Sequence, residues 1–111
     1  MNDWPIRIAP DPTAERRARA RSDPSFAAEA LRLADLSAGG TMAYPIEVAS
    51  ASEVEGRATS APCPICWGAP RRVDHVVAWR SRQPVRVVST RCKHCGLERN
   101  TYFSIRGITA S

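Results

Sequence analysis

Four cysteines in two close pairs place the strongest constraint on how this chain folds. The pairs are Cys63-Pro64-Ile65-Cys66 and Cys92-Lys93-His94-Cys95, separated by residues 67–91. Two residues between cysteines allow both thiolates to reach one ion, and a second such turn supplies the other half of a tetrahedron. The spacing therefore predicts one structural zinc ion, Zn²⁺, held by Cys63, Cys66, Cys92 and Cys95.

Three other kinds of cysteine site compete with zinc. A disulfide framework is rare in a reducing compartment, and a redox C-x-x-C pair needs a βαβ setting that this sequence lacks. Iron of the rubredoxin type uses the same four sulfurs, but such domains are typically acidic and this part of the chain is basic. His75 and His94 are possible substitute ligands. Because four cysteines complete the coordination shell, we expect both histidines on the surface or in the core.

The residues around the cysteines carry a resemblance to a known family. Pro64 follows the first cysteine, Gly68 comes soon after the first pair, and Gly96 follows the last cysteine, where a tight turn favours positive φ. This constellation resembles the knuckles of the zinc-ribbon superfamily over about residues 60–105. The resemblance implies two metal-binding turns joined by antiparallel strands, and it identifies no specific member.

One comparison within that superfamily bears on activity. Ribbons of transcript-cleavage elongation factors carry an acidic pair after an Arg-Ser at the hairpin tip. Here Arg80-Ser81 is followed by Arg82-Gln83-Pro84, so the carboxylates that would hold a catalytic metal are missing. The resemblance therefore extends to the layout of the ribbon and not to cleavage.

Alternating side chains predict three antiparallel strands around the second cysteine pair. They cover residues 71–80, 85–90 and 97–105, with 81–84 as a hairpin loop. Along the first strand, alternation places Arg71, His75 and Trp79 on one face and Arg72 on the other. The predicted fold is a small α+β protein whose zinc-ribbon domain spans 62–106. Its three-stranded sheet is small enough to need the metal for stability.

The N-terminal part, residues 1–48, is predicted to be a tail followed by helix. Residues 1–12 are rich in proline and predicted to be irregular, and 13–21 fit a short basic helix. Asp23 and Pro24 are start signals for an amphipathic helix over 23–37. Its apolar face either packs on the ribbon sheet or docks onto a partner protein.

Two segments connect this helix to the cysteines. Residues 44–48 fit either a short strand or a docking peptide. Residues 49–61 are rich in Ala, Ser and Glu, a composition that predicts a flexible linker between the N-terminal part and the ribbon.

The charge of the chain is concentrated in its C-terminal half. Residues 57–111 hold ten of the 16 basic side chains and two of the 11 acidic ones. Such asymmetry favours a polyanionic partner, most often nucleic acid, over a merely solvated surface. Arginine binds phosphate through a forked pair of donors, and an exposed tryptophan can stack on a base. The expected contact residues are Arg71, Arg72, Arg80, Arg82, Arg86, Arg91, Lys93 and Trp67.

The same residue inventory excludes several classes of protein. It contains no paired carboxylates in a plausible cleft, no Gly-rich phosphate loop and no Ser-His-Asp spacing, so we expect no enzyme. No apolar run approaches the roughly 20 residues of a membrane helix. Met1–Pro10 lacks the pattern of a secretory signal, and the expected compartment is the cytoplasm.

Two functions fit these observations. One is a ribbon that binds DNA or RNA, as a regulator or accessory factor of transcription or translation. The other is an adaptor subunit that uses the ribbon and the 23–37 helix within a larger protein assembly.

Overall fold

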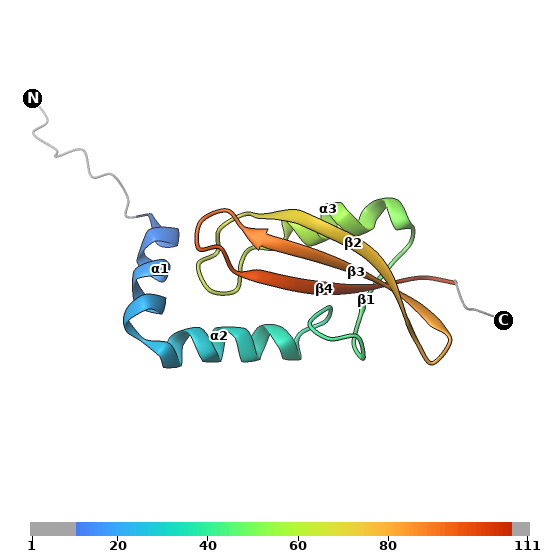
Figure 1. Ribbon diagram of the computed structural model, residues 1–111, viewed down its shortest axis with the longest axis horizontal. Coiled ribbons are helices and arrows are strands. Elements are labelled where there is room, and N and C mark those ends of the chain that lie inside the picture. The colour runs from blue at the N-terminus through green and yellow to red at the C-terminus, as the bar shows by residue number, and fades with distance from the viewer. Residues whose placement is uncertain (1–10, 108–111) are drawn as a thin grey trace, which may run out of the picture.

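The computed structural model describes residues 11–107 as a small α+β fold with three α-helices and a four-stranded mixed sheet (Figure 1). Most of the predicted irregular tail, residues 1–10, lies outside the described residues. The helices are α1 (Pro12–Ser22), α2 (Pro24–Leu36) and α3 (Val54–Ser60), and a 3₁₀ turn (Ala51–Glu53) precedes α3. The strands are β1 (Ile46–Val48), β2 (Pro70–Arg80), β3 (Gln83–Cys92) and β4 (Glu98–Ile105).

An Asp-Pro step starts each of the first two helices. The Asp11 carboxylate accepts a hydrogen bond from the Thr13 amide at 3.0 Å, and that of Asp23 accepts from Ser25 at 3.0 Å and Phe26 at 3.3 Å. These bonds satisfy amides that have no partner inside the helix. The following proline has no backbone N–H, and an N–H at that position would have no acceptor in the helix. Both predicted helices are confirmed.

The sheet has the order β1-β4-β3-β2, with antiparallel pairing of β3 to both β2 and β4. The prediction of a three-stranded antiparallel sheet was wrong in one respect, because β1 pairs in parallel with β4. The short Ile46–Val48 run covers backbone groups at the edge of β4 that would otherwise need water. Val48 is buried as a result and joins the core.

A register irregularity in β2 overturns the strict alternation predicted for that strand. The pairing with β3 shifts between Arg72 and Asp74, so Val73 is the extra, unpaired residue of a β-bulge. Arg72 and His75 consequently reach the same acceptor: both lie close to the carboxylate of Glu55 on α3, at 3.5 and 3.0 Å. Alternation without the bulge would have placed them on opposite faces.

The hairpin between β2 and β3 is tighter than predicted. Gln83 and Pro84 belong to β3, and the turn consists of Ser81 and Arg82, both with positive φ (48° and 66°). A two-residue turn of this handedness matches the right-handed twist of the flanking strands, which is why it replaces the expected four-residue loop.

The segment 49–61 is not the flexible linker that its composition predicted. It forms the 3₁₀ turn and α3, and it places Val54 (0 % exposed) and Ala58 (2 %) against Val88 and Phe103 of the sheet. Burial of these apolar side chains outweighs the weak helix signal of Ala, Ser and Gly in so short a segment. Thus α3 supplies the cover for one face of the sheet (Figure 1).

Helix α2 buries no residue completely among those described. Leu33 and Leu36 are exposed by 53 % and 65 %, and α2 is tied to the sheet through the Asp35–Arg99 ion pair at 3.6 Å. The rest of its apolar face is half-buried, so the full packing on the sheet that one interpretation of the sequence predicted is not seen. None of the helices in residues 11–107 combines the length and apolarity needed to cross a membrane.

Candidate metal centre

The two C-x-x-C segments fold into turns with matching backbone hydrogen bonds. In the first, the Cys63 amide donates to the Gly68 carbonyl and the Trp67 amide to the Cys63 carbonyl, both at 2.9 Å. In the second, Cys92 donates to Leu97 at 2.9 Å and Gly96 donates to Cys92 at 3.1 Å. The repeated pattern means that each pair of cysteines is presented by the same local geometry.

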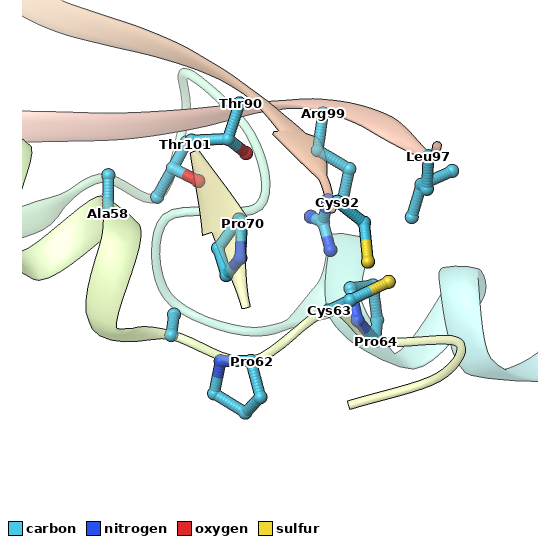
Figure 2. A pocket seen from close by; sticks show the side chains of 11 residues that line it. Ala58, Pro62, Cys63, Pro64, Pro70, Thr90, Cys92, Leu97, Arg99 and Thr101 are labelled. Atoms are coloured by element: carbon cyan, nitrogen blue, oxygen red, sulfur yellow. The ribbon is translucent and has the colours of Figure 1, made fainter. Parts of the chain in front are cut away.

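The fold brings the four cysteine sulfurs into one cluster. All four lie within 4.8 Å of one another, with Cys63 Sγ 3.6 Å from Cys95 Sγ and Cys66 Sγ 3.4 Å from Cys92 Sγ. Three of the cysteines are buried and Cys95 is exposed. Figure 2 shows the sulfurs of Cys63 and Cys92 meeting from separate segments of the chain. Four converging sulfurs of this kind could hold a single metal ion.

Backbone amides around the cluster are placed to donate hydrogen bonds to thiolates. The Gly68 amide points at Cys66 Sγ (3.3 Å) and the His94 amide at Cys92 Sγ (3.4 Å). A Cβ atom on Gly68 would lie 2.5 Å from the His94 ring and 3.0 Å from Cys92 Sγ, so only glycine fits between the two turns. Amide donors of this type stabilise thiolate ligands and fix their direction.

The protonation of the sulfurs depends on their surroundings. Burial raises the pKa of the Cys66 thiol, and burial together with the neighbouring Cys63 sulfur raises the pKa of Cys95 to about 12. Burial acts on Cys92 as well, but the amides of Cys95 and His94 outweigh it and bring its pKa to about 7. Four thiolates this close repel one another, so full ionisation requires a cation, which must compete with protons.

Trp67 holds a backbone conformation that its side chain disfavours. Its φ is 63°, in the place that Gly96 (φ 78°) takes in the second turn. The guanidinium of Arg16 on α1 lies 3.9 Å from the Trp67 ring centre and donates to the Ile65 and Pro64 carbonyls at 2.8 and 3.2 Å. Arg16 therefore ties α1 to the first turn, and the contact helps to hold Trp67 in place.

Replacing Arg16 with alanine is expected to release α1 from the first turn. The variant loses two hydrogen bonds and the stacked guanidinium, and we expect faster amide hydrogen exchange across Pro12–Ser22. Exchange in β3 and the metal content should stay unchanged, since neither depends on this contact. Unaltered exchange in α1 would contradict the assigned role.

The predicted basic contact residues do not form one surface. Arg80, Arg82 and Arg86 lie at the hairpin end, whereas Arg71, Arg72, Arg91 and Lys93 lie at the end near the cysteines. At the rise of an extended strand, Arg71 and Arg80 are about 30 Å apart along β2, and Arg86 and Arg91 are about 17 Å apart along β3. Two members are paired with acids, Arg72 with Glu55 and Arg91 with Glu98. Within residues 11–107, the hairpin arginines have no ion pair.

Trp67 is the aromatic contact residue expected from the sequence, and Trp79 is exposed to a similar extent. Trp79 is 62 % exposed, compared with 55 % for Trp67. It borders a shallow apolar depression with Val77, Pro84 and Ile105 on the face that also carries Arg86. The sequence already indicated that Trp79 is exposed. It adjoins Arg80 at the end of a hairpin, which a small hydrophobic core does not reach.

The two histidines lie outside the sulfur cluster. His75 is largely buried and its Nδ1 lies 3.0 Å from Glu55 Oε1, so it belongs to the contact between α3 and β2. The ring of His94 packs against Gly68. His75 is thus partly buried and His94 exposed, as the expectation of surface or core positions had it.

A small cavity beside the cluster lies between α3 and the sheet, with Ala58, Pro62, Cys63, Pro70 and Thr90 among its lining residues (Figure 2). Its volume of about 60 Å³ corresponds to about two water molecules.

No protein-family model, curated protein or solved structure matches this chain. The chemistry of its own residues is therefore the basis for inferring its function.

Proposed function

We propose that this protein is a non-catalytic zinc ribbon that binds single-stranded nucleic acid through the exposed end of its β2–β3 hairpin. The observation that carries the proposal is the combination there of three arginines without acidic partners among the described residues and a largely exposed tryptophan. A role as an accessory factor of transcription or translation belongs to the same proposal.

Zinc is the metal that best fits the ligand set. A tetrahedral ion about 2.3 Å from each of four sulfurs sets the sulfurs about 3.8 Å apart. The observed separations, 3.4 and 3.6 Å for two pairs and at most 4.8 Å for the rest, bracket that value. Four thiolates leave no open position for water, which supports a structural rather than a catalytic ion.

The hairpin end offers two kinds of contact to a single strand. Arg80, Arg82 and Arg86 supply forked donors for phosphates, and no carboxylate within residues 11–107 neutralises them. Trp79 and Val77 supply an apolar platform on which a base can stack. In a duplex the base faces are covered by stacking, so the tryptophan favours unpaired nucleotides. Figure 1 shows this end of the sheet pointing away from α1 and the cysteine turns.

The test is a titration of the zinc-loaded protein into labelled single-stranded and duplex DNA and RNA at several salt concentrations, followed by fluorescence anisotropy. We expect the R80A/R82A variant to bind more weakly and to flatten the salt dependence by about 0.7 per arginine in log–log slope. Trp79→Ala is expected to cost about 1–3 kcal/mol of binding at any salt concentration, since stacking carries no charge. Arg57→Ala, an exposed cation on α3, is the matched control.

Two results would contradict the proposal. One is equal binding by R80A/R82A and the control, which would place the contact elsewhere. The other is no binding at low salt, where electrostatic attraction is strongest. The second result would favour the adaptor function, for which the exposed Leu33 and Leu36 of α2 are the supporting observation. Capture of partner proteins by the intact chain, lost on L33D/L36D, would then be expected.

A further inference from the structure

The cysteine end of the molecule contains a second cavity, which the proposed function does not use. It lies between the α1–α2 corner and the second cysteine turn and has a volume of about 460 Å³. Arg17 and Arg21 from α1 line one side, and Ile65, His94, Gly96 and Leu97 line the other. The volume falls within the range of small-ligand sites.

The cationic side of this cavity has no acidic counterpart among the described residues. Arg17 and Arg21 are one helical turn apart, so their side chains extend from the same face of α1. The Nη1 atom of Arg17 is buried and has no hydrogen-bond partner within residues 11–107. A buried guanidinium nitrogen without an acceptor is costly, which points to an acceptor supplied from outside the chain.

The proposed zinc centre does not account for these charges. Zinc with four thiolates carries a formal charge of −2, and Cys95 borders the cavity. Arg16 already lies against the first turn and Lys93 is part of the second, so two cations are at hand without Arg17 and Arg21. No carboxylate lines the cavity. The two arginines therefore add positive charge beyond what the centre needs.

We propose that this cavity binds a phosphate monoester, with Arg17 and Arg21 holding the phosphate. A guanidinium fork matches two phosphate oxygens, and a dianion meets two cations. The apolar part of the wall, formed by Ile65, Leu97 and the alanines of α1 and α2, suits the body of a nucleotide-sized molecule. Such a phosphate can belong to the end of a nucleic-acid strand or to a free nucleotide.

The experiment compares ligands that differ only in the phosphate. Zinc-loaded protein carrying the R80A/R82A substitutions, which silence the hairpin, is titrated with a 5′-phosphorylated trinucleotide and its 5′-hydroxyl form. Adenosine 5′-monophosphate and adenosine form the second pair. We expect the phosphate to improve affinity by at least about tenfold in one or both pairs, and Arg17→Gln or Arg21→Gln to abolish the improvement. Arg57→Gln should leave it unchanged.

The pair that responds identifies the source of the phosphate, a strand end or a free nucleotide. Equal affinity within both pairs would overturn the proposal. A second measurement needs no variant: inorganic phosphate added to the native protein should shift the amide resonances of Gly96 and Leu97 and the Arg17 side-chain Nε resonance. Shifts confined to other residues would place phosphate elsewhere and overturn the proposal. Loss of zinc from Arg17→Gln without any effect of phosphate would show that the arginine only compensates the metal centre.

Discussion

Replacing Cys92 with serine is expected to unfold the sheet as well as to remove the metal. Cys92 is both a ligand candidate and the last residue of the central strand β3, so its loss acts directly on the sheet. Structural zinc contributes on the order of 10–16 kcal/mol in zinc-finger peptides, which equals or exceeds the whole stability of an ordinary small domain. We expect metal content to fall to zero and the thermal transition to disappear.

The measurements are metal analysis together with circular dichroism on heating, with Arg82→Ala as a folded control that leaves the cysteine cluster untouched. Treatment of the unmodified protein with a chelator should reproduce the effect, and added zinc should reverse it. The core of Val48, Val54, Ala58, Val88 and Phe103 is separate from the buried cysteines. If that core alone sustains the sheet, Cys92→Ser will melt like the unmodified protein, and the structural role of the metal will be wrong.

The cysteine cluster could be anticipated from the sequence because its signal is local. Two C-x-x-C turns fix their own geometry, and only their approach to each other depends on the fold. The helix cap at Asp23 could be predicted for the same reason, since it involves residues two and three positions apart. The exposed hairpin likewise follows from alternation on either side of a turn.

The features that sequence reasoning missed depend on contacts between distant residues. The pairing of β1 with β4 joins Ile46 to Phe103, and no local pattern records it. The bulge at Val73 accompanies the contacts of Arg72 and His75 with Glu55 on α3, which is far from β2 in the sequence. The contact of Arg16 with the Ile65 carbonyl, and the cavity around Arg17, arise only when α1 lies against the cysteine turns.

The segment 49–61 is the clearest case, and it leads to the second prediction. Its small polar residues suggested a linker, yet Val54 is completely buried between α3 and the sheet. Val54→Asp places a carboxylate in an apolar core without a cationic partner. We expect it to lower the free energy of unfolding by about 4 kcal/mol or more, enough to leave much of a small domain unfolded.

Val73→Asp is the matched control, because Val73 is 51 % exposed at the bulge and the same substitution there meets water. We expect a change of less than about 1 kcal/mol. Urea denaturation of both variants at saturating zinc separates the contribution of the core from that of the metal. A flexible linker would tolerate aspartate at residue 54 as well as the strand tolerates it at 73. Equal stability of the two variants would therefore restore the linker interpretation and remove α3 from the core.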